Sequence, residues 1–196
     1  IEPPFHRFMD FYRHYYPLGL AYVAASLRSH DHVVEIYDAE HDAKTRSKSY
    51  LETSQDYSKY LNAIGQRQHP VWSEIEQKII EFQPDLVGIS VLTVKVPSAL
   101  RIASISRTAL ERVPIVVGGE HPTARPEDLL KDENADFAIR GEGEQTMCEL
   151  VEALENDTAL EKVEGLSFKS EGRICHNKNR ALIENLDCLP NPARNS

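Results

Sequence analysis

Glycines, carboxylates and small polar side chains cluster where three apolar runs of the sequence end. The runs at 85–91, 114–119 and 136–141 are followed by short polar loops. In an open parallel sheet, ligands bind outside the carboxyl ends of the strands, so these loops are expected to meet at one edge. The candidate binding residues there are Ser90, Leu92, Thr93, Gly118, Gly119, Glu120, His121, Gly141, Glu142, Gly143 and Glu144. Glycine lacks a Cβ and lets a backbone approach a ligand. A tight turn is the better explanation of each glycine alone, but two glycine pairs on the same edge favour a binding site.

The same loops argue against a nucleotide or a phosphorylated aspartate as the ligand chemistry. Neither a Walker sequence nor GxGxxG occurs, and Glu142 and Glu144 near a helix start would repel a pyrophosphate. A response-regulator receiver needs clustered acids after its first strand and a lysine after its last. The sequence reads PPFHRF and RGEGE at those places. Binding of another kind of cofactor is therefore the better interpretation.

Short apolar runs alternate with helical patterns along the chain. Strands are predicted at 32–38, 85–91, 114–119 and 136–141, and helices at 17–28, 72–82, 97–110 and 143–154. This alternation predicts an α/β, Rossmann-like (flavodoxin-like) sheet of five mostly parallel strands with helices on both faces. Pro3 and Pro4 would end a first strand whose body lies upstream, so that strand is expected to be truncated.

Three segments fall outside this repeat. Residues 41–69 form an insertion in which Tyr57, Tyr60, Leu61 and Ile64 have helical spacing, which fits a helix or lid as well as a solvated loop. Residues 165–177 alternate around Ser-Glu-Gly and predict a β-hairpin attached to the sheet. The expected domains are thus 1–160 as the main domain, 161–180 as the hairpin and 181–196 as a linker.

Composition excludes several function classes. The net charge of −9 and the scattered basic residues disfavour nucleic-acid binding. No window approaches a membrane span and no signal peptide is evident, so a cytoplasmic location is expected. The three cysteines are far apart and predict neither disulfides nor a metal site, and Cys148 is expected to pack as a small hydrophobic residue.

The ordered motifs resemble a known family. Ser90-Val91-Leu92 and, after 25 intervening residues, Gly118-Gly119 are similar to the SxL and GG elements of cobalamin-binding domains. More specifically, a series of segments in order resembles the amino-terminal cobalamin-binding domain of radical SAM enzymes: PLGLAYVAASLR, DLVGIS, PIVVGGEHPTARPEDLL, DFAIRGEGEQTMCELVEAL, GLSFK and NLDCLPNPAR. The resemblance covers most of the chain except 41–69.

The resemblance implies which residues hold the cofactor. Ser90 would offer its hydroxyl to the nucleotide tail, Gly118 and Gly119 would leave room for the benzimidazole, and the loop 141–144 would face the tail or the amide arms. Carboxylates suit those arms because amides donate hydrogen bonds. In this family Pro17, Leu18 and Gly19 open the first helix near the corrin. Glu120 and His121 receive no definite role.

The cobalt ligation expected from the resemblance lacks a protein histidine. Domains of the methionine synthase type carry DxHxxG after the first strand, and here Asp10, His14 and Gly19 have the wrong spacing. Base-off, His-off cobalamin is therefore expected, with His14 or His6 as the less favoured ligand. Tyr12, Tyr15 and Tyr16 would either stack over the corrin or pack before the helix.

The resemblance further implies a larger enzyme, most often a methyltransferase that uses methylcobalamin, S-adenosylmethionine and a [4Fe–4S] cluster. No CxxxCxxC occurs in this sequence, so the chain alone is expected to bind cofactor without catalysis, next to a radical SAM domain downstream. The alternative is a cofactor-free interaction domain of the same fold, in which the loops only make turns.

Overall fold

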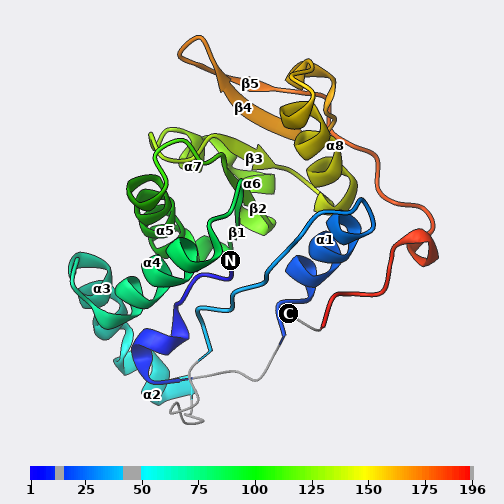
Figure 1. Cartoon of the computed structure of the whole chain (residues 1–196). Coiled ribbons are helices and arrows are strands. Elements are labelled where there is room, and N and C mark those ends of the chain that lie inside the picture. Colours follow the sequence, from blue (N-terminus) through cyan, green and yellow to red (C-terminus); the bar gives the residue numbers. More distant parts are fainter. Residues whose placement is uncertain (12–15, 42–49, 195–196) are drawn as a thin grey trace.

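A mixed five-stranded sheet forms the centre of the molecule. The computed structural model describes residues 1–11, 16–41 and 50–194 (Figure 1). The strands lie in the order β1-β2-β3-β4-β5, with β1 (Val87–Ser90), β2 (Ile115–Gly118), β3 (Phe137–Ile139), β4 (Leu166–Ser170) and β5 (Arg173–His176). The first three strands are parallel, and β4 and β5 add to β3 as an antiparallel hairpin. The Rossmann-like fold expected from the sequence is confirmed.

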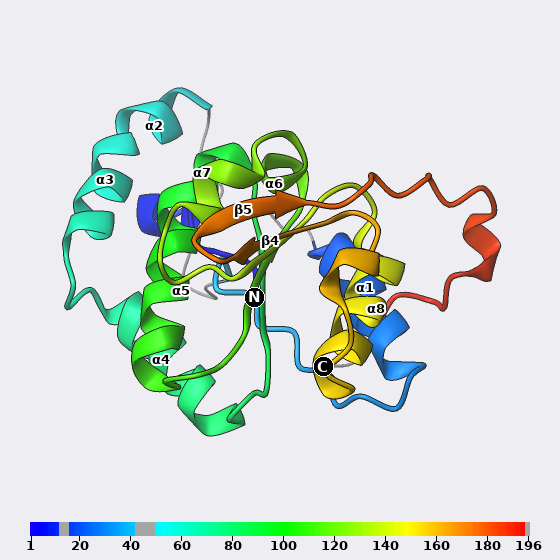
Figure 2. The same cartoon turned by 90° about the horizontal axis from the view of Figure 1, so that it is seen from above.

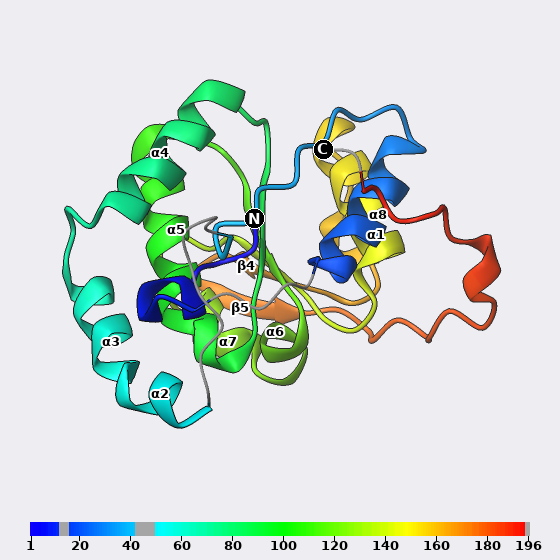
Figure 3. The same cartoon turned by 90° about the horizontal axis from the view of Figure 1, so that it is seen from below.

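Helices cover both faces of the sheet (Figures 2 and 3). One face carries α1 (Leu18–Arg28) and α8 (Gly143–Glu155), and the other carries α4 (Pro70–Phe82) and α5 (Val96–Ala109), with α2 (Tyr50–Gln55) and α3 (Tyr57–Gly65) farther out. Two short helices, α6 (Glu120–Ala124) and α7 (Pro126–Leu130), follow β2. Four 3-10 turns complete the fold: η1 (His6–Met9), η2 (Thr93–Lys95), η3 (Leu160–Lys162) and η4 (Leu186–Cys188).

Local sequence explains where α4 begins and ends. Pro70 is its first residue, and the ring of the N-cap His69 accepts a hydrogen bond from the Val71 N–H. The helix ends where Gln83 adopts a left-handed conformation before Pro84. The predicted helix at 72–82 is thus confirmed, and it begins two residues earlier, at Pro70.

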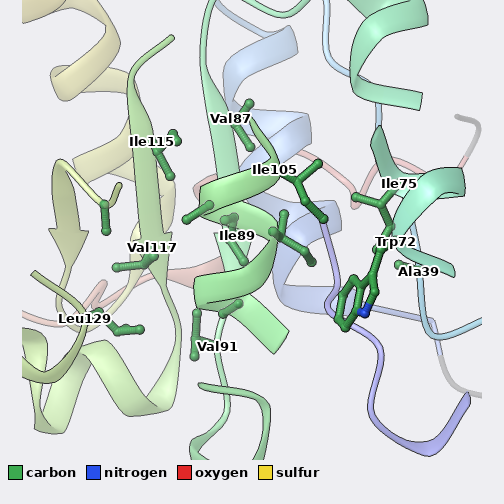
Figure 4. Packing of buried hydrophobic residues seen from close by; sticks show 14 of the residues in the cluster. Ala39, Trp72, Ile75, Val87, Ile89, Val91, Ile105, Ile115, Val117 and Leu129 are labelled. Carbon is green, nitrogen blue, oxygen red and sulfur yellow. The ribbon is translucent and has the colours of Figure 1, made fainter. Parts of the chain in front are cut away.

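The two faces of the sheet have separate hydrophobic cores. On the α4–α5 side, Ile89 and Val117 from the strands lie near Ile105 of α5, with Trp72 and Ile75 of α4 beyond it (Figure 4). On the α1–α8 side, the buried residues include Leu27, Val116 and Leu150. Apolar side chains on both faces are the reason why β1 and β2 read as continuous apolar runs.

The predicted strand at 32–38 was wrong over most of its length. Within it, the structure has only one parallel bridge, between Asp38 and Glu2, and Val33 is 87% exposed. A strand needs neighbours that satisfy its backbone groups. Ile1 and Glu2 are the residues that lie beside this segment, and they reach only its carboxyl end.

The described part of the insertion contains the two helices α2 and α3. Tyr60 of α3 is buried, and its hydroxyl donates to the Val94 carbonyl at 3.1 Å, while the Trp72 indole N–H donates to the Ala63 carbonyl at 2.9 Å. These contacts confirm a packed helix rather than a solvated loop. Residues 42–49 of the insertion lie outside the described part of the chain.

The carboxyl-terminal segments also have defined places. Glu171 and Gly172 both have positive φ, at 50° and 74°, as a two-residue hairpin turn requires, so the predicted hairpin is confirmed. Beyond it, the chain runs past α8 and returns to α1, where the Ala193 N–H donates to the Ala21 carbonyl (Figure 1). In the described residues, no helix is both long and apolar enough to cross a bilayer.

Candidate cofactor-binding site

Ser90 and Gly118 are direct neighbours at the carboxyl edge of the sheet. They are ladder partners at the last paired position of β1 and β2. One residue farther, the Val91 N–H donates to the Gly118 carbonyl at 2.7 Å, and the His121 N–H donates to the Val91 carbonyl at 3.1 Å. The loops after β1 and β2 are therefore held together, as the sequence predicted.

The two adjacent glycines have different structural reasons. Gly119 has φ of 114°, and a Cβ there would lie 3.1 Å from the Val91 carbonyl oxygen, so the fold itself requires glycine. A Cβ on Gly118 would meet only the Cβ of Ile139, at an ordinary 3.9 Å. The packing of this chain does not require glycine at position 118, which leaves its bare backbone available to a ligand.

His121 lies beneath the loop after β1. It is 8% exposed, and its Nδ1 lies 3.2 Å from the Thr93 hydroxyl. Its Nε2 is buried without a hydrogen bond within the described chain, and the nearest acid is Asp128, with a carboxylate oxygen at 3.6 Å. His121 therefore braces the loop that carries Leu92 and Thr93. Glu120, its neighbour, is exposed at the start of α6.

The loop between β3 and α8 joins the same edge. The Gly141 N–H donates to the Thr123 hydroxyl at 2.9 Å, which ties this loop to α6. Glu142 accepts the Ile183 N–H at 2.6 Å, so one of its carboxylate oxygens already holds the carboxyl-terminal segment. At the first turn of α8, one carboxylate oxygen of Glu144 is buried and makes no hydrogen bond within the described residues.

The start of α1 approaches this edge from the other side. Val23 of α1 lies against Gly143, where a Cβ would come within 3.4 Å of the valine methyl group. Pro17 is buried and acts as the N-cap, whereas Leu18 is 48% exposed and Gly19 is also exposed. Leu92 and Val94 in the loop after β1 are exposed as well.

The tyrosines before α1 divide into two groups. Tyr16 donates its hydroxyl to the Ala193 carbonyl at 2.6 Å, so it packs against the carboxyl-terminal segment. Tyr12, His14 and Tyr15 lie outside the described residues. Stacking of these side chains on a corrin stays a prediction.

Sequence reasoning missed a buried ionic cluster below the candidate site. Lys95, 0% exposed, lies 2.5 Å from Glu2 and 3.3 Å from Glu40, measured between its Nζ and their carboxylate oxygens. Glu40 also accepts the backbone N–H groups of residues 5–7 and a hydrogen bond from the His6 ring. Glu2 and Glu40 are far apart in the sequence, and no local pattern there pointed to a shared partner.

The cluster fixes the charge of Glu40. Burial alone would raise the pKa of this carboxyl, but the bond from His6, the charge of Lys95 and the backbone N–H groups outweigh it and lower the pKa to about 2. Glu40 is thus ionised at neutral pH and anchors η1 to the end of 32–38. Residues 5–7 are thereby held beside the end of the segment 32–38.

The cysteines contribute no ligand set. Cys148 is half-buried in α8, and burial raises the pKa of its thiol, which suits a packed side chain. Across the described residues, no group of three histidines, cysteines or acids could hold a metal ion.

Comparison with known families decides what this arrangement is. The model of the B12-binding domain matches residues 10–151, which is most of the chain. The chain belongs to the B12-binding domain family. Cobalamin is the cofactor of this family, and the match spans β1, β2, β3 and all three loops described above.

This B12-binding domain is similar to parts of larger proteins. It is 34% identical over 178 residues to an uncharacterised methyltransferase of Pyrococcus horikoshii, which covers 90% of this chain and 33% of that protein. It is 31% identical over 174 residues to the anaerobic magnesium-protoporphyrin IX monomethyl ester cyclase of a Synechocystis strain. That alignment covers 87% of this chain and 30% of the cyclase. The chain thus spans about a third of the length of these curated relatives.

Solved structures agree on the fold. The cobalamin-dependent S-adenosylmethionine radical enzyme OxsB, bound to aqua-cobalamin and S-adenosylmethionine, superposes with a TM-score of 0.71 at 20% identity, covering 98% of this chain and 23% of that one. The radical S-adenosylmethionine methyltransferase TsrM from Kitasatospora setae superposes with a TM-score of 0.60 at 19% identity. This superposition covers 83% of this chain and 27% of TsrM. The B12-binding domain described here therefore has the fold of the corresponding parts of those enzymes.

Proposed function

We propose that this chain holds cobalamin at the carboxyl edge of β1–β3, with the nucleotide tail against Ser90 and Gly118. The register that pairs these two residues is the observation that carries the proposal. Ser90 brings a hydroxyl and Gly118 brings a backbone without a side chain to adjacent points of one edge. A flat aromatic tail needs both a polar contact and close backbone approach.

The residues around this pair fit the other parts of cobalamin. Exposed Leu18, Leu92 and Val94 offer apolar contact to the corrin face. The buried carboxylate oxygen of Glu144, which has no hydrogen bond among the described residues, suits an amide N–H of a corrin arm. Glu142 is already bonded to Ile183 through one oxygen, so it is assigned a supporting role.

We further propose base-off cobalamin without a protein histidine on cobalt. His6 is oriented by Glu40 through its Nδ1, and His121 is buried against Thr93 and near Asp128, so both rings have structural roles within the chain. The test is the electron paramagnetic resonance spectrum of bound cob(II)alamin in the wild type and in the His6→Ala and His14→Ala variants. A spectrum without nitrogen splitting in all three supports the proposal, and splitting that disappears in either variant refutes it.

The whole protein is proposed to be a radical SAM enzyme, and a methyltransferase in particular. The support is the similarity to a methyltransferase that is three times as long as this chain and the fold shared with OxsB and TsrM. In such an enzyme, methylcobalamin supplies the transferred methyl group. In this proposal, the chain's own contribution is to bind and orient the cofactor.

The partner of this module is proposed to be a radical SAM domain of the same polypeptide. Residues 178–194 do not extend away freely. Arg180 donates to the Thr146 hydroxyl at 2.8 Å and also bonds Glu149, and Ala193 returns to Ala21 of α1. The segment up to Ala193 is therefore held beside Tyr16 and α1.

Binding of hydroxocobalamin to the purified chain tests the proposed function. Co-elution of the corrin absorption with folded protein supports it. Absence of binding by a folded chain would favour the alternative, a cofactor-free interaction domain. One observation favours this alternative. The fold alone requires glycine at position 119, because a Cβ there would lie too close to Val91, so this glycine needs no ligand to explain it.

A further inference from the structure

A buried histidine joins an exposed hydroxyl at the carboxyl edge of the sheet to a carboxylate of α7. His121 is 8% exposed, and its Nδ1 lies 3.2 Å from the hydroxyl oxygen of Thr93 in the loop after β1. Its Nε2 lies 3.6 Å from a carboxylate oxygen of Asp128. These three residues form a polar series, called here the histidine bridge, that runs from α7 to the surface of the candidate site.

Asp128 decides which nitrogen of His121 carries the hydrogen. A neutral imidazole has one N–H donor and one acceptor nitrogen. A carboxylate oxygen attracts an N–H and repels a lone pair, so the hydrogen belongs on Nε2, the nitrogen that faces Asp128. The other oxygen of Asp128 accepts from the Arg125 guanidinium at 3.3 Å, so the two oxygens have separate partners. Nδ1 of His121 is then left as an acceptor.

The Thr93 hydroxyl therefore faces a ligand as an acceptor. Its single hydrogen is donated to Nδ1 of His121, and it has no second hydrogen-bond partner among the described residues. Thr93 is exposed, so the remaining lone pairs of its oxygen are open to a ligand. A hydroxyl whose hydrogen is used within the protein accepts a hydrogen bond from a ligand but does not donate one.

The neighbouring side chains have the same polarity. The loops 90–94, 118–121 and 141–144 carry glutamates at 120, 142 and 144, and their sequences contain neither lysine nor arginine. One oxygen of Glu144 is buried without a hydrogen bond in the described part of the chain. A carboxylate on a ligand would face like charges and acceptor oxygens here, whereas an amide N–H would find partners.

We propose that Thr93, oriented by His121 and Asp128, makes the site select corrinoids whose arm at this position is an amide over those in which it is a carboxylate. This selectivity rests on the proposed function, in which cobalamin occupies the edge. Thr93 is the residue that contacts the arm, and His121 and Asp128 are positioning residues that act through it. An ionised carboxylate arm has no N–H, so its contact with Thr93 would set two acceptors against each other.

The test compares hydroxocobalamin with its monocarboxylic acids, in each of which one amide arm is hydrolysed. Affinities are measured by corrin absorbance at about pH 8, where an ordinary imidazole is neutral and a carboxylic acid is ionised. At least one acid should bind the wild type about tenfold or more weakly than hydroxocobalamin does. Equal affinity for hydroxocobalamin and every acid would overturn the selectivity and leave the proposed function standing. A folded chain that binds no corrinoid would overturn both.

Asp128→Asn is expected to reverse the hydrogen bonds of the histidine bridge. Arg125 requires an acceptor, so the new amide oxygen faces Arg125 and the new NH₂ group donates to Nε2 of His121. The hydrogen then lies on Nδ1, and the Thr93 hydroxyl becomes a donor. The preference for hydroxocobalamin over the rejected acid should shrink by about threefold or more. Glu133→Gln removes the same charge at an exposed position after α7 and should keep the wild-type preference. A wild-type preference in Asp128→Asn would overturn the proposal.

Thr93→Val separates the hydroxyl from a general effect of charge. Valine has a similar shape without the hydroxyl, so hydroxocobalamin should bind about twofold to tenfold more weakly. Adding Asp128→Asn to Thr93→Val should leave the preference between the two corrinoids unchanged, because Asp128 acts only through Thr93. If Asp128→Asn shifts the preference equally with and without the Thr93 hydroxyl, its charge acts on the ligand directly and the proposal is wrong.

Discussion

Ser90 and Gly118 end two neighbouring parallel strands at the same level, as ladder partners. Their backbones lie side by side, and the loops that leave them are bonded to each other through Val91 and His121. Because these contacts are made by the backbone, the edge is set before a ligand arrives. Binding there requires little rearrangement, which favours affinity.

Substitution of Gly118 is expected to separate binding from folding. In Gly118→Val, the branched side chain would stand where the cofactor tail lies, while the folded chain has room for the Cβ itself. Cobalamin affinity should fall by about tenfold or more, equivalent to ~1.4 kcal/mol, as measured by titration of corrin absorbance. The matched control is Gly65→Val at the end of α3, where no atom lies within 4 Å and affinity should not change. Unchanged affinity in Gly118→Val would show that the nucleotide tail of cobalamin does not lie against Gly118.

Gly119→Ala is expected to affect the fold first. The residue has positive φ, and its new Cβ would lie 3.1 Å from the Val91 carbonyl oxygen. The free energy of unfolding should fall by about 1–3 kcal/mol, as measured by urea denaturation. A variant as stable as the wild type would show that the backbone of this loop is not constrained by Val91.

Ser90→Ala should weaken binding without changing stability much. Its hydroxyl is half-exposed at the end of β1, and loss of one hydrogen bond to a ligand costs roughly 0.5–1.5 kcal/mol. The expected result is a twofold to tenfold weaker affinity for cobalamin at an unchanged melting temperature. Thr108→Ala, which removes a hydroxyl that donates to the Ser104 carbonyl at an exposed position of α5, serves as the control. Equal affinity in Ser90→Ala and the control would show that the Ser90 hydroxyl makes no hydrogen bond to cobalamin.

Acid should destabilise the chain through Glu40. Its pKa is about 2 in the folded chain and about 4.5 in the unfolded one, so the folded state binds the proton more weakly. The stabilisation is complete above pH 4.5 and is lost as the pH falls toward 2, by about 3 kcal/mol in all. Stability curves from pH 7 to pH 2 measure this loss.

The Glu40→Gln variant isolates that contribution. It removes the Glu40 charge from beside the buried Lys95 ammonium and should be less stable than the wild type at pH 7, with a smaller further loss between pH 4.5 and 2. Glu111→Gln, at an exposed position, should retain the wild-type curve. A wild-type acid profile in Glu40→Gln would assign the loss to other carboxyls.

Much of the fold could be predicted from local patterns. The runs that form β1, β2 and β3 are apolar because both faces of those strands are covered. Pro70 and Pro126 begin helices, and Gly172 lies in the hairpin turn, because the backbone preferences of these residues suit those places. The segment 32–38 failed because a strand depends on its neighbours as well as on its own residues. Its β-branched residues suit a strand, but only Asp38 has a strand partner.

The candidate site could be located but not explained from the sequence. Motif order brought Ser90, Gly118 and the 141–144 loop to one edge, and the structure places them there. Glycine is required at position 119 because Val91, from another part of the chain, lies against it. Lys95 is likewise buried against residues that are distant in the sequence. No local pattern distinguishes a lysine that pairs with Glu2 and Glu40 from one that is solvated.

The central claim is that this edge holds cobalamin, and titration of the purified chain with hydroxocobalamin tests it most directly. Corrin absorbance should co-elute with the wild type in a one-to-one ratio and with Gly65→Val equally, and it should be reduced with Gly118→Val. A folded wild-type chain that elutes free of corrin, or equal retention by Gly118→Val, would contradict the account.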